Sequence, residues 1–317
     1  MINQKRVSPE TIKSYRDTFR IYIEYLNVVH KCPPQKINLE HIEAEYILGF
    51  LEYLDQKRGN QTKTINNRLA AIHAFLQFIS FERPEHSATV QRSLMIPFQK
   101  TEKRQLDFLT KEEVDAFLEA CPMKEILGRR DRMMLLILYN TGMRVSELVS
   151  LRCRDIIFDG SGITGYAHVR GKGRKERNIP LWKTTASYIK KHIKEHGLKP
   201  DDKLFINHMG DELTRSGVRY RINCLKERAQ KITPGLKAKK ISPHTFRHST
   251  ALHLLQSGVD ISTIAIWLGH ESINTTHKYM EADMEMKQKI LEKIAEPSVS
   301  GYRYKPPKDI LSFLAAL

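Results

Sequence analysis

The chain has 317 residues, and 52 Lys and Arg against 36 Asp and Glu give it a net charge of +16 at pH 7. This length predicts about two domains, and an apolar fraction of 41% excludes disorder over most of the chain. The charge predicts a polyanionic partner, and nucleic acid is favoured over an anionic membrane because no apolar run is long enough to cross a bilayer.

Residues 1–96 are predicted to form a small all-helical domain. The first helix is expected to begin at Pro9, and the second to end near Gly59, which can adopt the left-handed conformation of a helix C-terminus. Apolar residues at spacings of three and four predict helices over 12–26, 42–54 and 65–79.

Residues 97–106 are basic and have no periodicity, so we interpret them as a linker between the domains. The start of the third predicted helix is also polar and basic. Both segments suit phosphate contacts, although a solvated protein face has the same composition. The residues expected to contact DNA are Lys63, Arg68, Lys100, Lys103 and Arg104.

Residues 107–297 are predicted to form a second domain, mainly helical with a small antiparallel sheet. A Thr-x-x-Glu capping box at Thr110 predicts a helix start, and an apolar helix over 129–140 is expected to end at Gly142. Helical patterning resumes at 183. Short segments rich in Ile, Val and Tyr predict strands over 155–158, 163–169 and 176–181.

Residues 298–317 are predicted to form a separate tail that ends in a short amphipathic helix. Its apolar stripe is too small to fold alone. The stripe is therefore expected to dock on a neighbouring subunit, with packing against its own subunit as the alternative. The stripe consists of Ile310, Leu311, Phe313 and Leu314.

A candidate anion site follows Ser242, which suits a helix N-cap, with Pro243 as the first helical residue. His244 and Arg247 then lie on one face of the first turn, close to the free N–H groups of the helix N-terminus. The alternative is a surface turn that happens to be basic.

A second candidate site follows the helix expected over 260–268. This helix is expected to end at Gly269 in the left-handed conformation, which would fix the direction of His270. Tyr279 follows nine residues later among polar neighbours. Taken alone, the histidine and the tyrosine are each typical of packing residues.

In combination, these motifs resemble the tyrosine recombinase (phage integrase) family, in particular its mobile-element and Xer-like site-specific recombinases. The matching segments occur in the family's order, and residues 10–85 resemble its helical SAM-like core-binding domain, so the resemblance covers nearly the whole chain. The motifs are Thr141–Leu148, Gly171–Arg177 with Ile179–Leu181 as a catalytic β-hairpin, His244-x-x-Arg247, Leu268–His270 and Tyr279.

The resemblance implies an enzyme that cleaves and rejoins DNA strands through a 3′-phosphotyrosine formed by Tyr279. Arg144 and Arg247 would donate forked hydrogen bonds to the scissile phosphate, with His244 and His270 as further donors. Glu147, one turn after Arg144, is expected to orient it. The general acid for the 5′-hydroxyl is assigned to Lys172, with Lys175 as the alternative.

No metal and no cofactor are expected. The cysteines form no C-x-x-C pair, and His244 and His248 share helical spacing but lack an acidic partner nearby. No phosphate-binding loop motif is present. The four scattered cysteines and an N-terminus without an apolar signal segment predict a cytoplasmic protein; they are Cys32, Cys121, Cys153 and Cys224.

The expected partners follow from the same resemblance. They are a double-stranded DNA recombination site, clasped by the two domains as a C-shaped clamp, and further copies of the chain, as a dimer on the site and a tetramer in the synapse through segment 309–317. Companion recombinases are a further candidate, and a membrane is not expected.

Integration, excision or transposition of a mobile element is the favoured role, because the extended tail resembles recombinases of transposon-type elements. The alternatives are chromosome or plasmid dimer resolution, a type IB topoisomerase-like enzyme and a non-catalytic DNA-binding regulator.

Overall fold

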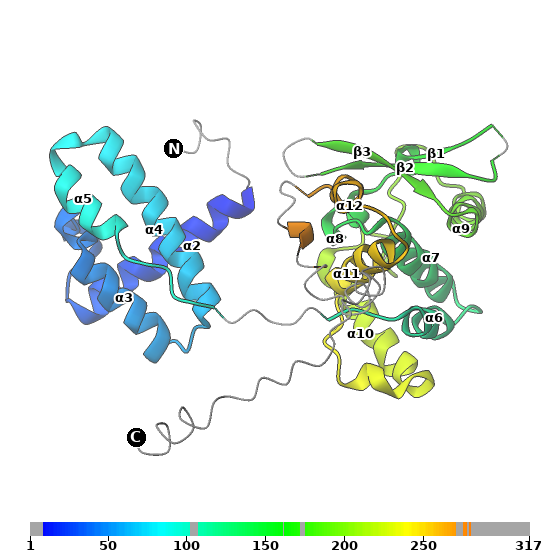
Figure 1. Ribbon diagram of the computed structural model, residues 1–317, viewed down its shortest axis with the longest axis horizontal. Helices are drawn as coiled ribbons and strands as arrows, with labels where there is room; N and C mark the ends of the chain where they lie inside the picture. Colours follow the sequence, from blue (N-terminus) through cyan, green and yellow to red (C-terminus); the bar gives the residue numbers. More distant parts are fainter. Residues whose placement is uncertain are drawn as a thin grey trace, which may run out of the picture. The chain divides into compact units, whose positions relative to one another are not determined.

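The computed structural model describes residues 9–101, 107–160, 162–171, 175–270, 275–277 and 279 (Figure 1). The chain divides into two compact units, Met1–Arg104 and Gln105–Leu317. The described part is mostly helical and contains a small three-stranded antiparallel sheet, which confirms the predicted fold class. The predicted tail over 298–317 lies outside the described residues.

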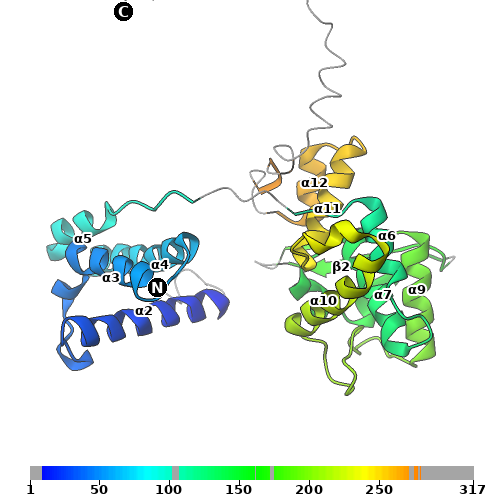
Figure 2. The same cartoon turned by 90° about the horizontal axis from the view of Figure 1, so that it is seen from below.

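The N-terminal unit is a helical bundle in which the two long helices α2 and α4 pack together (Figure 2). Its core is built from the apolar stripes seen in the sequence, with Leu26, Phe50 and Leu76 fully buried. The helices are α2 (Pro9–Val29), α3 (Ala44–Gln56), α4 (Thr62–Glu82) and α5 (Ser87–Leu94), with 3₁₀ turns η1 (Pro34–Lys36), η2 (Leu39–Ile42) and η3 (Pro84–His86).

The second unit packs its helices around the contact between α7 and α11. The predicted capping box is present, because Glu113 N–H donates to Thr110 Oγ1 and Thr110 N–H donates to Glu113 Oε2. The helices are α6 (Lys111–Glu119), α7 (Ile126–Thr141), α8 (Val145–Ser150), α9 (Lys183–Glu195), α10 (Arg215–Ile232), α11 (Pro243–Gln256) and α12 (Ile261–Leu268), with 3₁₀ turns η4 (Cys153–Asp155) and η6 (Pro234–Lys237).

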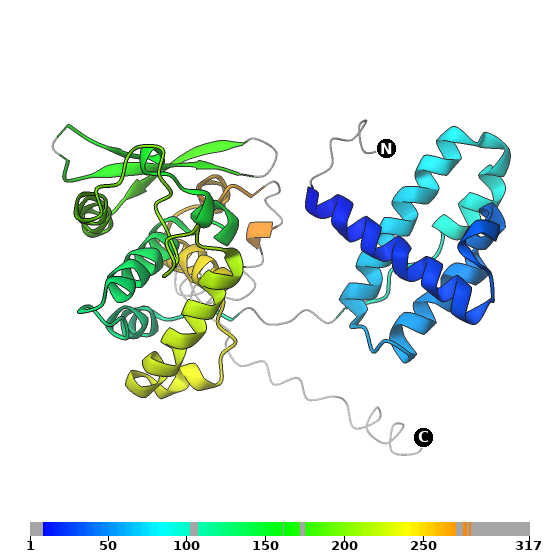
Figure 3. The ribbon, with the colours of Figure 1, turned by 180° about the vertical axis from the view of Figure 1, so that it is seen from behind.

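The sheet of this unit lies on the side opposite α6 and α10 (Figure 3). Its strands pair in the order β1-β2-β3, and Ala167 of the central strand lies opposite both Ile156 and Ile179. These three side chains are buried, whereas Tyr166 faces outward, as the two-residue period of a half-buried sheet requires. The strands are β1 (Ile156–Phe158), β2 (Gly165–Arg170) and β3 (Glu176–Leu181).

The chain reverses after α7 at Gly142, whose φ of +59° is the left-handed conformation that glycine adopts without strain. A Cβ atom at this position would lie 2.5 Å from Leu268 Cδ2. Gly142 therefore allows the end of α7 to lie close to the end of α12, and it places Arg144 at the start of α8.

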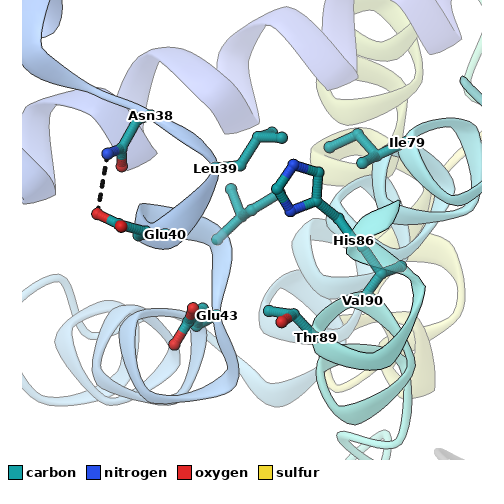
Figure 4. A pocket seen from close by; sticks show the side chains of 9 residues that line it. Asn38, Leu39, Glu40, Glu43, Ile79, His86, Thr89 and Val90 are labelled. Carbon is teal, nitrogen blue, oxygen red and sulfur yellow. Dashed lines mark hydrogen bonds between the residues drawn. The ribbon is translucent and has the colours of Figure 1, made fainter. Parts of the chain in front are cut away.

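The N-terminal unit contains a pocket of about 300 Å³ (Figure 4). Apolar side chains such as Leu39 and Val90 face polar groups such as His86, and Asn38 Nδ2 donates to Glu40 Oε2 at 2.9 Å. The pocket is lined by none of the residues predicted to be catalytic.

Within the described segments, no helix is both long enough and apolar enough to cross a membrane.

Candidate active site

Three successive backbone carbonyls at the C-terminal end of α12 accept hydrogen bonds from three arginines. The last carbonyls of a helix have no partner within the helix and carry its negative partial charge, so they attract cations. This arrangement gathers residues from α8, β3 and α11 at one point. Arg177 Nε donates to Trp267 O at 3.0 Å, Arg247 Nη2 to Leu268 O at 2.7 Å and Arg144 Nη2 to Gly269 O at 3.1 Å.

Arg247 is the most deeply buried of these arginines, with a side chain that is 4% exposed. It also donates from Nη1 to Gly142 O at 2.7 Å, so its guanidinium bridges the ends of α7 and α12. Burial and the charge of Arg144 lower the pKa of Arg247 to about 10, which still leaves it charged at neutral pH. Each terminal nitrogen carries two N–H groups, so Arg247 can donate to these carbonyls and to a bound anion together.

Glu147 is a buried carboxylate that links two of the arginines. It accepts from Arg177 Nη2 at 2.8 Å and Nη1 at 3.2 Å, and from Arg144 Nη1 at 3.0 Å and backbone N–H at 2.8 Å. Burial acts to raise the pKa of Glu147, but the hydrogen bond and charge of Arg177, together with Arg144, hold that pKa below its ordinary value. Glu147 therefore orients Arg144, whose side chain remains 30% exposed.

Replacing Glu147 by glutamine is expected to lower the free energy of unfolding by about 3 kcal/mol at pH 7, because two guanidinium groups lose a buried counter-charge. Pairing lowers the folded-state pKa of Glu147 below its unfolded value of about 4.3, so this stabilisation is complete above the unfolded pKa and disappears as pH falls through the folded one. Denaturant titrations of the wild-type protein and of Glu147→Gln, at pH values from about 7 to about 3, measure this difference in free energy of unfolding.

Glu176→Gln is the matched control. Glu176 pairs with Arg170 at 3.3 Å, but its side chain is 52% exposed, so the loss is expected to stay below about 1 kcal/mol. Equal losses for the two variants, or a Glu147 effect that does not shrink on acidification, would contradict a buried ion pair.

Tyr279 lies in a small apolar cluster between α11 and α12, and its side chain is 4% exposed. Its hydroxyl forms a hydrogen bond of 3.0 Å with His248 Nδ1. Burial raises the pKa of Tyr279, and the charges of Arg247 and Arg144 act in the opposite direction. The phenol is therefore protonated at neutral pH and lies within the field of both arginines.

His270 stacks on the Tyr279 ring with centroids 6.3 Å apart, and its Nδ1 lies 2.7 Å from Thr276 Oγ1. Burial and the arginine charges lower the pKa of His270 to about 4, so the ring is neutral at pH 7. When the threonine hydroxyl donates to Nδ1, the ring proton sits on Nε2 and can be donated to an anion.

The prediction that the helix ends at Gly269 is confirmed, with φ at +65°. A Cβ atom here would lie 2.9 Å from Arg177 Nη1, so glycine also makes room for the guanidinium. Both effects fix the point at which His270 leaves the helix.

His244 lies exposed in the first turn of α11. Although part of its side chain reaches the surface, desolvation by neighbouring atoms and the charges of Arg247 and Arg144 lower its pKa, so it too is favoured in the neutral form near these arginines. The Ser242 N–H donates to Thr245 Oγ1 at 3.0 Å, and this hydrogen bond caps the predicted helix start.

Lys172 lies outside the described residues, so the structure does not place it. The base of its loop is described: Gly171 N–H donates to Lys175 O at 2.7 Å, and the Lys175 side chain is exposed. A Cβ atom at Gly171 would lie 3.4 Å from Glu147 Oε1, so this base lies beside the ion pairs.

Five of the six residues predicted as catalytic are therefore brought to one place by the structure: Arg144, His244, Arg247, His270 and Tyr279. The sequence analysis did not predict two further residues of this cluster. They are His248, which contacts Tyr279, and Arg177, which forms a double hydrogen bond with Glu147. The position of Arg177 in the hairpin motif was the available signal for the second.

Among the predicted DNA contacts, Lys63 and Lys100 are exposed. Arg68 is partly buried, and desolvation and the nearby charges of Arg58 and Arg20 lower its pKa. Asp17 acts on this pKa in the opposite direction, and the Nε of Arg68 is buried without a hydrogen-bond partner. Lys103 and Arg104 lie outside the described residues.

No group of three or more His, Cys, Asp and Glu side chains that could hold a metal ion occurs among the residues that the structure describes.

The sequence matches two family models, the phage integrase family over residues 107–286 and the phage integrase N-terminal SAM-like domain over residues 1–82. A Sinorhizobium fredii protein named as an integrase/recombinase (y4rC) is 40% identical over 319 residues, covering 100% of this chain and 95% of the relative. The tyrosine recombinase XerD of Oceanobacillus iheyensis is 34% identical over 287 residues, covering 87% and 89%.

Solved structures show the same fold. The Tn1549 transposon integrase in complex with circular intermediate DNA superposes with a TM-score of 0.69 at 18% identity, covering 92% of this chain and 96% of that one. The XerH recombinase bound to difH substrate has a TM-score of 0.62 at 25% identity, covering 86% and 76%. The chain therefore belongs to the phage integrase family of tyrosine recombinases, enzymes that cleave and rejoin DNA in site-specific recombination.

Proposed function

We propose that Tyr279 is the nucleophile of this recombinase and that Arg144 and Arg247 bind the scissile phosphate. The observation that carries this assignment is the position of the Tyr279 phenol, which is buried in the field of two arginines anchored at the end of α12. The tyrosine oxygen would attack phosphorus and form a 3′-phosphotyrosine, while the bond to the 5′ oxygen breaks. The ester retains the energy of that bond for rejoining.

The same residues account for stabilisation of the transition state, in which the phosphate carries additional negative charge. Planar guanidinium groups donate paired hydrogen bonds to non-bridging oxygens, and the carbonyls and Glu147 hold these groups in place before DNA binds. His244 and His270, favoured in the neutral form, would add donors without adding charge. This chemistry requires neither a metal nor a cofactor.

The experiment that tests this assignment uses a half-site DNA with a nick beside the cleavage position, so that the short leaving strand diffuses away. The wild-type protein is expected to accumulate as a covalent adduct. Proteolysis and mass spectrometry should place the DNA on the peptide that contains Tyr279. An adduct on any other residue would overturn the assignment.

We propose Lys172 as the acid that protonates the leaving 5′ oxygen, with Lys175 as the alternative on the same turn. A 5′-bridging phosphorothiolate needs no proton on its leaving group. This substrate is expected to restore cleavage by Lys172→Ala to within about ten-fold of wild type, from a loss of about 100-fold on ordinary DNA. Rescue of Lys175→Ala in place of Lys172→Ala would transfer the role.

The proposed partners are a double-stranded recombination site and further copies of the chain. The family membership and the likeness to recombinases whose titles describe DNA complexes support this proposal. The two units would clasp the duplex as a C-shaped clamp, with phosphate contacts from the residues predicted above. Segment 309–317 would join subunits of a tetramer by docking in trans, and docking in cis is the alternative.

For the biological role we propose integration, excision or transposition of a mobile element, carried out in the cytoplasm. The similarity to an integrase/recombinase over the whole chain and the fold shared with a transposon integrase support it. Dimer resolution is the second candidate, because relatives named XerD match over most of the chain. Recombinase genes and inverted repeats flanking the coding sequence would favour the mobile element, and a housekeeping locus would favour dimer resolution.

A further inference from the structure

The Tyr279 side chain packs against one face of α11, and its hydroxyl contacts His248 on that face. His248, Ala251 and Leu255 are spaced by three and four residues, so they lie along the same face of the helix. The tyrosine belongs to the apolar cluster that contains Ala251 and Leu255. The rings of His248 and Tyr279 have centroids 5.6 Å apart, and the hydroxyl oxygen lies 3.0 Å from Nδ1. This distance is short enough for direct proton transfer.

The other groups around the phenol are less suited to receive its proton. Arg144 and Arg247 are cations at neutral pH. The Nδ1 of His270 is engaged by Thr276 Oγ1, and its ring stacks on the tyrosine face with an interplanar angle of 17°. The ring of His244 lies one turn from His248, with centroids 6.1 Å apart. By contrast, the Nδ1 of His248 lies within hydrogen-bond distance of the Tyr279 hydroxyl, at 3.0 Å.

We infer that His248 is a further catalytic residue, which accepts the phenolic proton of Tyr279 during cleavage and returns it during rejoining. This inference rests on the proposed role of Tyr279 as nucleophile. As the Tyr279 Oη–phosphorus bond forms and the phosphorus–5′ oxygen bond breaks, the phenolic proton moves to His248 Nδ1. The leaving oxygen takes its proton from the general acid. When a 5′-hydroxyl later attacks the phosphotyrosine, His248 protonates the departing phenolate.

The chemistry of the phenol explains why such a residue is required. Burial keeps Tyr279 protonated at neutral pH, and a protonated phenol is a weak nucleophile. Imidazole is the side chain best matched to proton transfer near neutral pH. A hydrogen bond from the phenol to Nδ1 requires the tautomer protonated at Nε2, so this tautomer is the reactive one.

The test separates proton transfer from simple positioning. In His248→Asn, the amide oxygen can replace Nδ1 as a hydrogen-bond acceptor but cannot take up a proton, and His248→Phe removes both properties. Single-turnover cleavage of the nicked half-site is expected to slow by about 100-fold in both variants. DNA binding and thermal unfolding are measured on each protein to confirm that it is folded.

A second arm changes the acidity of the nucleophile. Incorporation of 2,3,5-trifluorotyrosine at position 279 gives a phenol that ionises near neutral pH and needs less help from a base. It is expected to reduce the defect of both His248 variants to about ten-fold or less. A defect of unchanged size, or a His248→Asn variant that cleaves within about three-fold of wild type, would show that His248 only orients the tyrosine and would overturn the inference.

His253 provides a matched control five residues further along α11. Its Nδ1 lies 2.7 Å from the hydroxyl of Tyr139, so it forms the same kind of pair outside the arginine cluster. His253→Asn is expected to cleave at the wild-type rate, and a loss equal to that of His248→Asn would reject a specific role for His248. Failure of the proposed function is distinguishable, because the wild-type protein would then form no adduct at Tyr279.

Discussion

Replacing Tyr279 by phenylalanine is expected to abolish the covalent protein–DNA adduct, with single-turnover cleavage reduced by roughly 10⁴-fold or more. The variant lacks the attacking oxygen but retains the ring that packs between α11 and α12. It loses one hydrogen bond, to His248, which costs about 1 kcal/mol of stability. Denaturing gels of the nicked half-site reaction measure the adduct, and gel shifts measure DNA affinity, which is expected to be unchanged.

Tyr139→Phe is the control for this variant, because Tyr139 also donates to or accepts from a histidine of α11, His253. It loses an equivalent hydrogen bond and should form the adduct at the wild-type rate. An adduct in Tyr279→Phe, or its loss in both variants, would contradict the assignment of the nucleophile.

The local features of this site were predictable because short-range signals determine them. Gly142 and Gly269 both end helices, as predicted from their positions after apolar stretches, and both adopt the left-handed conformation. The Thr110 capping box also depends only on residues three positions apart. Once the helices have formed, such features place Arg144 and His270 at helix ends.

The contacts between these elements were not predictable from local signals. His248 and Tyr279 are 31 positions apart, and Arg177 and Glu147 are 30 apart, so their pairing depends on how the elements pack. The sequence placed His248 only at helical spacing from His244, a pair that was rejected as a metal site because no acidic partner lies nearby. That spacing carries no information about a tyrosine from another segment.

Helix α5 shows the same limit in the N-terminal unit, because its eight residues were not predicted as a helix. A helix this short is unstable alone and depends on packing. Ser93 is fully buried and donates to Ile42 O at 3.1 Å, which ties α5 to a turn 51 residues earlier. Only the folded unit supplies this partner.

The structure also shows where part of the net positive charge of the chain is used. Part of the +16 is paired within the fold, since Arg144 donates to the backbone at the end of α12 and Arg177 donates to the buried Glu147. In the proposed mechanism, internal acceptors of this kind would hold the guanidinium groups in position before DNA binds and so lower the reorganisation needed during the reaction. We propose that the surface lysines serve the phosphate backbone of DNA.

Replacing Arg247 by lysine is expected to slow cleavage by about 10³-fold, although the charge is retained. One ammonium group cannot bridge Gly142 O and Leu268 O while also presenting a planar pair of donors to the phosphate. The ends of α7 and α12 lose their link, so the free energy of unfolding should fall by about 1–3 kcal/mol. Affinity for DNA should change little, because contacts elsewhere on the backbone dominate it.

Arg130→Lys separates the catalytic effect from the structural one. Arg130 is also 4% exposed, and it donates to Ile206 O at 2.8 Å and to the buried Asp131. Its replacement should cost similar stability, yet leave single-turnover cleavage near wild type when both variants are assayed well below their melting temperatures. If the two lysine variants cleaved at the same rate, Arg247 would be a structural residue, and stabilisation of the phosphate would have to come from Arg144 without it.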